Sequence, residues 1–285
     1  MLDNLSTGKL ENLSGFESRL EFVEGDITDL DTVRQCCRGA DLVFHHAALA
    51  SVPQTVEDPV RSASVNDMGT LNVLLAARDG GVKRVVYASS SAVYGDGYDP
   101  PHDETMTPLP DTPYAAHKLL GEHYARMFGS LYGLEVVSLR YFNVYGPRQD
   151  PSSPYSGVIS IFMDRLYRNQ ELVVYGDGGQ SRDFVYVGDV VRANFLAAQA
   201  PDMGGQVLNI GTGLQVTLNG MIKILESMVN REISVRYAPR RAGDVYASGA
   251  LVDKALKVLG YQSEMPFEKG LGITWDWYRS RADMA

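Results

Sequence analysis

The stretch from Arg84 to Lys118 decides the fold of this 285-residue chain. It opens Arg84-Val-Val-Tyr-Ala-Ser-Ser-Ser-Ala-Val-Tyr-Gly95, passes through an acidic, proline-rich segment, and ends Tyr114-Ala-Ala-His-Lys118. The apolar run at 85–88 predicts a buried parallel strand whose carboxyl end carries the three serines at 89–91. Open α/β sheets bind their ligands at this edge, so we expect the functional site there.

Tyr114 and Lys118 are four residues apart, which places them on one face of a helix. A phenol with an ordinary pKa of about 10 is a poor base at neutral pH, but a nearby cation favours the phenolate. The hydroxyl of Ser90 can share the same proton path. Such a set can move a proton on or off a substrate hydroxyl while a hydride moves elsewhere. The Tyr-x-x-x-Lys spacing also arises by chance in helices, but its position after a strand that ends in three serines favours catalysis.

Motifs in one order along nearly the whole chain resemble the extended short-chain dehydrogenase/reductase family. The similarity is to its nucleotide-sugar epimerase branch, the UDP-glucose and UDP-N-acetylglucosamine 4-epimerases. The motifs are Ser90 with Tyr114-Ala-Ala-His-Lys118, Arg140-Tyr-Phe-Asn-Val-Tyr-Gly-Pro-Arg148, Asp3-Asn-Leu-Ser-Thr-Gly8, Arg182-Asp-Phe-Val-Tyr-Val187 and Arg241-Ala-Gly-Asp244. The resemblance implies an NAD-dependent isomerase of nucleotide-sugar metabolism, with Ser90, Tyr114 and Lys118 as catalytic residues.

Composition and charge narrow the class of protein. Hydrophobic residues make up 45% of the chain, enough for a full core, and its length favours two lobes. The net charge of −9 argues against a nucleic-acid partner. No stretch is long and apolar enough to span a membrane, and Met1-Leu-Asp-Asn is unlike a signal peptide. The adjacent Cys36 and Cys37 suit reduced thiols on a helix, so we expect a cytoplasmic protein.

The alternation of strands and helices up to about residue 146 predicts right-handed βαβ units. Strands are expected at 19–23, 41–45, 85–88 and 135–139, and helices at 29–38, 58–80 and 114–132. The helix at 58–80 is indicated by the periodic apolar residues Val60, Ala63, Val65, Leu71, Leu74 and Leu75. Residues 1–3 look like the end of a further strand. The fold class is therefore α/β, a Rossmann-like, doubly wound parallel sheet whose first strand and helix are missing.

A Pro-, Ser- and Tyr-rich segment at 147–157 reads as a crossing to a smaller α/β substrate-binding lobe. Strands are expected at 172–175, 184–187, 206–210 and 234–237, and helices at 159–168, 189–200, 217–229, 253–259 and 267–278. We predict an NAD-binding lobe at 1–146, with returns at about 182–210 and 237–255, and a lobe at 147–285 that mainly binds the UDP-sugar.

The start of the chain departs from the family pattern. Relatives carry a first strand and a Gly-x-x-Gly-x-x-Gly turn that holds the dinucleotide pyrophosphate at a helix N-terminus. Neither precedes Met1, and Gly176-Asp-Gly-Gly179 lies after the catalytic region. Either a front segment is missing or the cofactor site is damaged; we favour a missing segment because the downstream site residues are present.

The resemblance also assigns residues to the cofactor. The acid Asp3 would hold the adenosine ribose hydroxyls, which favours NAD over NADP. Asp26 and Ile27 would lie beside the adenine, the small-residue turn after His46 along the diphosphate, and Asn66 would hold the active-site backbone. The predicted cofactor-binding residues are Asp3, Asn4, Ser6, Thr7, Gly8, Asp26, Ile27, Ala47, Ala48, Leu49, Asn66, Tyr114, Lys118 and Phe142.

The predicted substrate-binding residues match a charged diphosphate, which guanidinium and amide donors recognise. They are Ser90, Tyr114, Asn143, Tyr175, Arg182, Arg241, Asp244 and Ser248. In this branch, a bulky aromatic at the position of Ser248 restricts the enzyme to plain hexoses. The small serine predicts that UDP-GlcNAc and UDP-GalNAc are accepted, with UDP-Glc and UDP-Gal as further substrates. A shifted register would instead place Tyr246 in that space.

The reaction follows from what surrounds Ser90. Related dehydratases carry an Asp-Glu pair after the catalytic hydroxyl residue, where this chain has Ser91-Ala92, so assisted elimination is disfavoured. Reversible oxidation at C4 remains, with tightly held NAD. The open alternatives are a non-catalytic UDP-sugar-binding protein and another reductase or dehydratase of the family. No cluster has metal-site spacing, and His45 and His46 read as packing residues. By family analogy we expect a homodimer, formed by the helices that carry Tyr114 and follow Asp58.

Overall fold

The computed structural model describes residues 1–151, 157–240 and 245–282. They group into two compact units. Unit 1 comprises Met1–Val93, Pro110–Arg140 and Ala197–Leu208, and unit 2 comprises Tyr94–Leu109, Tyr141–Leu196 and Asn209–Ala285. This grouping differs from the predicted division. Two returns to the first lobe were expected, at 182–210 and 237–255, and only Ala197–Leu208 from them falls in unit 1.

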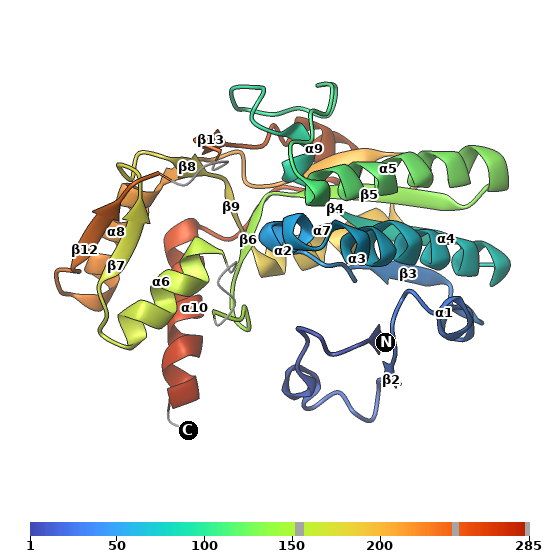
Figure 1. Cartoon of the computed structure of the whole chain (residues 1–285), viewed down its shortest axis with the longest axis horizontal. Helices are drawn as coiled ribbons and strands as arrows, with labels where there is room; N and C mark the ends of the chain where they lie inside the picture. The colour runs from blue at the N-terminus through green and yellow to red at the C-terminus, as the bar shows by residue number, and fades with distance from the viewer. Residues whose placement is uncertain (152–156, 241–244, 283–285) are drawn as a thin grey trace. The chain divides into compact units, whose positions relative to one another are not determined.

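The main sheet of unit 1 has the strand order β10-β5-β4-β3. Its strands are β3 (Leu42–His45), β4 (Arg84–Ser90), β5 (Glu135–Tyr141) and β10 (Val207–Ile210). β3 and β4 are parallel, and His45 lies opposite Tyr87. A separate parallel pair joins β1 (Leu2–Asp3) to β2 (Val23–Glu24) (Figure 1). Residues 84–89 are all buried, as expected for a strand covered on both faces.

Two helices of unit 1 have caps that the sequence encodes locally. α1 (Leu30–Cys37) begins after Asp29, whose side chain accepts from the Asp31 and Thr32 amides. α5 (Pro113–Tyr132) begins after Thr112, whose hydroxyl accepts from the Ala115 amide, and ends at the left-handed Gly133. Both cysteines lie on or at the end of α1 as free thiols, as predicted.

The predicted helix at 58–80 is in fact three segments. They are α3 (Pro59–Ala63), the π-helical turn η2 (Ser64–Met68) and α4 (Gly69–Asp79). Single π-turns inside helices often accompany functional sites. Val60, the first residue of the apolar pattern that predicted this helix, is 80% exposed. The sequence analysis also missed α2 (Val52–Glu57), and the strand predicted at 19–23 is confined to Val23–Glu24.

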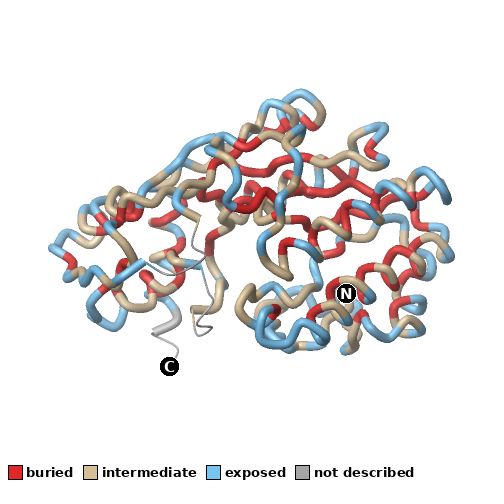
Figure 2. Tube along the Cα trace, turned by 45° about the horizontal axis from the view of Figure 1, so that its top comes forward, coloured by how far each residue is buried: buried red, intermediate tan, exposed pale blue. Residues whose placement is uncertain are grey.

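The core of unit 1 forms where small helix residues meet β-branched strand residues. Ala76 and Ala77 of α4 pack in one buried cluster with Val85 of β4 and Val136 of β5. Figure 2 shows the buried residues running along these elements. The alanines allow a helix to lie close to the sheet, so α4 packs near β3 while α5 packs near β4.

Unit 2 contains short strand pairs and five helices among its described residues. The helices are α6 (Val158–Tyr167), α7 (Val187–Gln199, whose last residues fall in unit 1), α8 (Leu218–Val229), α9 (Asp253–Leu259) and α10 (Phe267–Ala282). The strands are β6 (Asn143–Tyr145), β7 (Leu172–Tyr175), β8 (Ser181–Arg182), β9 (Phe184–Tyr186), β11 (Val216–Thr217), β12 (Val235–Ala238) and β13 (Ala247–Ser248). β7 pairs with β12, β6 with β9, and β8 with both β11 and β13. A second core cluster packs α6, α8 and α10 around Phe162, Met221 and Leu271.

Candidate active site

The three predicted catalytic residues all lie in unit 1. Ser90 is the last residue of β4, and Tyr114 and Lys118 are one turn apart near the start of α5. The Ser90 hydroxyl accepts a hydrogen bond from the Ala92 amide at 3.2 Å and shares one with the Tyr114 phenol. The arrangement expected from the sequence, a hydroxyl at the strand end facing a Tyr-x-x-x-Lys helix, is therefore present.

Lys118 is buried, and both its ammonium and its backbone carbonyl make hydrogen bonds. Its Nζ donates to the Ala88 carbonyl at 2.7 Å and lies 5.8 Å from the centroid of the Tyr114 ring. Its own carbonyl accepts from the Tyr87 hydroxyl at 3.4 Å. Burial lowers the pKa of Lys118 from 10.5 to about 8, because the ammonium loses its hydration.

Tyr114 shows where the electrostatic expectation from the sequence was incomplete. Burial raises the pKa of its phenol, and the hydrogen bond from Ser90 opposes that change only in part. The nearby Lys118 cation does not reverse the direction in the protein alone. A phenolate at this position therefore needs further stabilisation, such as a second positive charge next to the ring.

His45 is a neighbour that the sequence analysis treated only as a packing residue, and the structure supports that interpretation. It is buried in β3, its Nε2 lies 2.9 Å from the Thr70 hydroxyl, and its ring lies 5.6 Å from that of Tyr87. Burial, with the Lys118 charge as a second cause, lowers the pKa of His45 to about 3. The imidazole is neutral at physiological pH.

The predicted adenosine-binding residues form a compact set of turns. Asp3 Oδ1 accepts from the Leu5 amide at 2.8 Å, and the Ser6 amide donates to Asn4 at 3.0 Å. Asn4 Nδ2 donates to Asp26 Oδ2 at 2.7 Å. Burial raises the pKa of Asp26, but hydrogen bonds from Thr28 and Asn4 outweigh it, so the carboxyl stays ionised.

This loop has the properties that a dinucleotide ribose requires. A Cβ on Gly8 would lie 3.0 Å from Asp3 Oδ1, so a larger residue here would press on the carboxylate. Ser6 and Thr7 are exposed in the same turn. The chemistry of the set, one carboxylate acceptor and small hydroxyl residues, fits the ribose of NAD, and an acid at this position disfavours a 2′-phosphate.

Asn66 fixes the backbone of the predicted nicotinamide-side turn. Its Oδ1 accepts from the Leu49 amide at 2.8 Å, and its Nδ2 donates to the Leu49 carbonyl at 3.1 Å. Asn66 belongs to the π-turn η2, so this turn holds the backbone of Leu49 in place. The next residue, Asp67, binds His117 of α5 at 2.8 Å, which ties η2 to the helix of Tyr114. This pair was not predicted from the sequence. The available signal was that Asp67 follows Asn66 and His117 precedes Lys118.

Two predicted cofactor residues are core residues in the structure. Ile27 is 7% exposed, and its side chain fills the space that a Cβ on Gly69 would need. Phe142 is 4% exposed and packs near Tyr94 and His102 in unit 2. Of the turn at 47–49, Ala47 is exposed and Ala48 and Leu49 are half-buried. The roles predicted for these residues stay predictions.

Apart from Ser90 and Tyr114, which lie in unit 1, the predicted substrate residues that the structure describes lie in unit 2. Arg182 and Ser248 face each other across the β8 and β13 pairing. Arg182 donates to the carbonyls of Ser181 at 2.8 Å and Tyr246 at 3.2 Å. Asn143 begins β6 and Tyr175 ends β7. Arg241 and Asp244 lie outside the described residues.

The register between β13 and β8 shows which residue lies next to Arg182. Ser248 lies opposite Arg182, whereas the Tyr246 hydroxyl lies against Gly179 and its ring under the Arg240 guanidinium, 5.6 Å from the ring centroid. Ser248, and not Tyr246, is therefore the residue that pairs with Arg182, and its place next to the C2 substituent of a sugar stays a prediction.

Asp183 is an organising residue of unit 2 that the sequence analysis did not single out. Its buried carboxylate accepts from the Thr212 amide and hydroxyl, the Gly213 amide at 2.9 Å and the Ala250 amide at 3.2 Å. Because it follows Arg182 directly, it anchors the segment that presents the guanidinium. Its place in the motif Arg182-Asp-Phe was the available signal.

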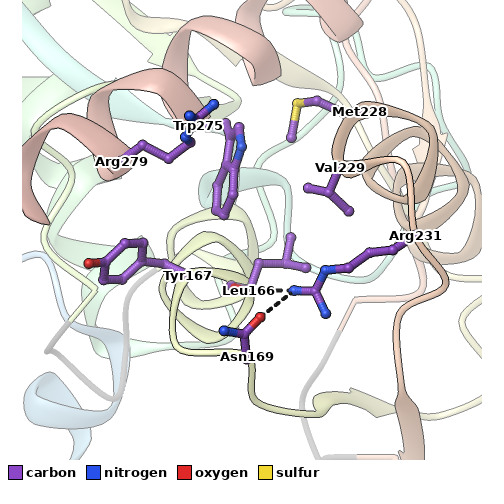
Figure 3. Close-up of a pocket in the computed structure, with 8 residues that line it drawn as sticks. All are labelled: Leu166, Tyr167, Asn169, Met228, Val229, Arg231, Trp275 and Arg279. Carbon is purple, nitrogen blue, oxygen red and sulfur yellow. Dashed lines mark hydrogen bonds between the residues drawn. The ribbon is translucent and has the colours of Figure 1, made fainter.

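A pocket of about 400 Å³ in unit 2 is separate from these residues. Leu166, Tyr167, Asn169, Met228, Val229, Arg231, Trp275 and Arg279 line it, at the ends of α6 and α8 and along α10 (Figure 3). Arg231 donates to the Leu166 carbonyl and to Asn169 Oδ1. None of the predicted site residues contributes to it.

Within the described ranges, no group of three or more His, Cys, Asp or Glu side chains could hold a metal ion. No helix in that part of the chain is long and apolar enough to cross a membrane.

Comparison with known proteins identifies the family. A sequence profile described as the NAD dependent epimerase/dehydratase family matches residues 2–211. The chain belongs to this family. NAD is the cofactor named for it. A UDP-glucose 4-epimerase of Mycolicibacterium smegmatis is 38% identical over 285 residues, covering 99% of this chain and 90% of the relative.

Solved structures extend the similarity to the fold of this epimerase/dehydratase. UDP-N-acetylglucosamine 4-epimerase of Methanobrevibacter ruminantium, in complex with UDP-N-acetylmuramic acid, aligns with a TM-score of 0.94 at 39% identity and covers 98% of this chain and 90% of its own. UDP-glucose 4-epimerase of Thermus thermophilus, in complex with NAD, aligns with a TM-score of 0.89 at 39% identity, with the same coverage. The predicted fold class is confirmed.

Proposed function

We propose that this protein is an NAD-dependent UDP-sugar 4-epimerase that interconverts UDP-GlcNAc and UDP-GalNAc, and also UDP-Glc and UDP-Gal. The observation that carries the proposal is the Ser90, Tyr114 and Lys118 set at the end of β4. Ser90 and Tyr114 share a hydrogen bond, and the Lys118 ammonium, bound to the Ala88 carbonyl, lies 5.8 Å from the centroid of the Tyr114 ring. Relatives named as 4-epimerases of both plain and N-acetylated hexoses support the reaction type.

In the proposed reaction, Tyr114 removes the proton of the C4 hydroxyl as the C4–H bond gives up a hydride. NAD, when bound, supplies the hydride acceptor. This half would leave the sugar oxidised to a 4-keto intermediate. After the sugar presents its other face, hydride returns to C4 and Tyr114 returns the proton, so neither protons nor electrons are consumed overall.

The raised pKa of Tyr114 indicates how the chain avoids deprotonation in the absence of substrate and cofactor. Burial disfavours the phenolate, and the Lys118 ammonium nearby does not compensate by itself. The oxidised nicotinamide ring is also a cation, which would favour the phenolate when it lies next to the phenol. In this proposal, Ser90 orients the phenol and Lys118 supplies part of the positive potential.

The preference for acetylated sugars depends on Ser248. A serine opposite Arg182 presents little bulk, whereas a Tyr side chain at that position would fill it. The diphosphate is assigned to Arg182, Arg241 and Asn143, the uridine ribose to Asp244, and the base to Tyr175. A homodimer through the surface of α3 and α5 completes the proposal, by analogy with the family.

Two measurements test the function. The purified chain, supplied with NAD and UDP-GlcNAc, should give UDP-GalNAc signals by NMR, and the variant Tyr114→Phe should lose about 100-fold or more of kcat while its circular dichroism is unchanged. UDP-sugar binding without turnover, with NAD present, would indicate a binding protein instead. A lasting 4-keto-6-deoxy product would indicate a dehydratase.

A further inference from the structure

Three residues on one face of α5 contact the last three residues of β4. Tyr114, Lys118 and Glu122 follow each other at intervals of four, so their side chains lie along one stripe of the helix. Tyr114 hydrogen-bonds Ser90, and Lys118 Nζ donates to the Ala88 carbonyl. The third contact, from the Ser89 hydroxyl to Glu122 Oε1 at 2.5 Å, joins a residue with no role in the proposed reaction.

Glu122 is buried together with a cation from the neighbouring strand. It is 6% exposed, and Arg140 of β5 is 3% exposed. Arg140 Nε donates to Oε1 at 2.9 Å and its NH2 group donates to Oε2 at 2.7 Å. The fork geometry fixes the carboxylate in both position and plane, so one side chain connects α5, β4 and β5.

A buried ion pair of this kind is weak evidence for stability, because desolvation of both charges offsets their attraction. Its geometric effect is more specific. Glu122 lies one helical turn beyond Lys118, so it prevents α5 from sliding or turning against β4 next to the reacting groups. Without the contact to Ser89, packing alone would hold the helix, and small shifts of a reacting group reduce rates strongly.

We propose that Glu122, held by Arg140, is a positioning residue that fixes α5 against the end of β4 and thereby sets the Tyr114 to Ser90 and Lys118 to Ala88 contacts. The inference rests on the proposed function for its kinetic test, but its geometric part concerns this chain alone. It assigns a role to a residue outside the Ser90, Tyr114 and Lys118 set.

The chain offers a matched control at the other end of the same two strands. Arg84 at the start of β4 binds Glu135 at the start of β5, with Nε 2.9 Å from Oε2, and also donates to the Ala197 and Ala198 carbonyls. Six residues of strand separate Arg84 from Ser90, or about 20 Å. Glu135→Gln therefore breaks an ion pair between β4 and β5 far from the reacting groups.

The kinetic test compares Glu122→Gln with Glu135→Gln. We expect Glu122→Gln to lower kcat about 10- to 100-fold with KM changed less than about threefold, because geometry rather than binding is lost. Glu135→Gln should retain kcat within about twofold, even if its unfolding midpoint falls by as much as that of Glu122→Gln. Equal effects of the two variants on kcat would overturn the proposal.

A second variant and a second readout cover the cases where Glu122→Gln folds poorly or the wild type shows no turnover. Ser89→Ala removes only the link to β4 and leaves the Glu122 to Arg140 pair intact. With tyrosine labelled at Cζ, the Tyr114 resonance, assigned by its loss in Tyr114→Phe, should move and titrate differently in Ser89→Ala and not in Glu135→Gln. An unchanged Tyr114 resonance in Ser89→Ala refutes the positioning role whatever the activity, whereas an inactive wild type with a shifted resonance refutes only the proposed function.

Discussion

Lys118 lies next to the groups proposed to transfer the proton, and this buried place disfavours the charged form of its side chain. The side chain is 5% exposed and makes one hydrogen bond of 2.7 Å to a backbone carbonyl, with no carboxylate among the causes that alter its pKa. The folded protein therefore holds an ammonium whose pKa, about 8, is close to the working pH. This is typical of lysines that act in proton transfer.

The pH dependence of stability should reveal this lysine. The unfolded chain keeps a pKa near 10.5, so between pH 8 and 10.5 the unfolded state binds more protons and the unfolding free energy rises with pH. The contribution is fully present above 10.5 and is lost as the pH falls through 8; it amounts to about 3 kcal/mol. In urea titrations, we expect the unfolding free energy of the wild type minus that of Lys118→Met to increase as the pH rises through this range.

Lys83 provides the control for that experiment. It is exposed, and its bond to Asp41 at 2.8 Å raises its pKa, so its small contribution should be lost as the pH rises. Lys83→Met should therefore change the pH dependence slightly and in the opposite direction. A wild-type minus Lys118→Met difference that is flat with pH would show that Lys118 titrates normally in the folded protein.

Substrate choice is also a question of one residue. Ser248→Tyr should lower kcat/KM for UDP-GlcNAc about 10- to 100-fold more than for UDP-Glc, because the ring would occupy the space needed by the acetamido group. Ser248→Thr, which adds one methyl group, is the control and should change the ratio little. Equal losses on both sugars would place Ser248 away from the C2 substituent.

At the scale of the element, α5 lies unusually close to β4. A Cβ on Gly121 would be 2.3 Å from both Cζ and the hydroxyl oxygen of Tyr87, which is itself buried. The helix approaches the strand over a residue without a side chain, and this approach brings Lys118 to the Ala88 carbonyl. The π-turn η2 makes two separate contacts: Asn66 binds the Leu49 backbone, and Asp67 binds His117 of α5.

Two glycines of α5 give a paired prediction. Gly121→Ala should destabilise the protein by about 1–3 kcal/mol, because the clash with Tyr87 exceeds the helix-propensity gain. Gly129→Ala meets nothing closer than 3.7 Å and should stabilise by up to about 1 kcal/mol. Urea unfolding of both variants measures the signs. A stabilised Gly121→Ala would mean that α5 can move away from β4 without cost.

At the scale of the whole molecule, each unit has its own hydrophobic core, one around Val85 and Val136 and the other around Phe162 and Met221. Unit 1 nevertheless leaves apolar residues exposed on its helices. Val56 is 58% exposed, Val60 is 80% exposed and Met127 is 39% exposed. Such residues on neighbouring helices suit burial against a second copy of the chain.

We therefore predict that the protein elutes as a dimer and that Val60→Asp shifts it to monomer in size-exclusion chromatography with light scattering. Burying an unpaired carboxylate in an apolar contact opposes association. The control is Leu256→Asp on α9 of unit 2, where the helix leucine is 49% exposed and its substitution should leave the dimer intact. A monomeric wild type, or a dimeric Val60→Asp, would contradict the predicted surface.

The sequence by itself determined the strands and helices whose signals are local. The apolar run before Ser89 predicted β4, and the four-residue spacing predicted that Tyr114 and Lys118 share a face. The family motifs predicted the chemistry. These features depend on residues within a few positions of each other, so the order of residues is sufficient to find them.

Only the tertiary structure decided which distant residues meet. It joined Glu122 to Ser89 and Arg140, placed Asn66 on Leu49, and set Ser248 opposite Arg182. It also reversed the expected direction of the Tyr114 pKa, because desolvation depends on every element packed around the phenol. Burial and hydrogen bonds between distant segments form when the chain folds around its core, and a local pattern does not encode them.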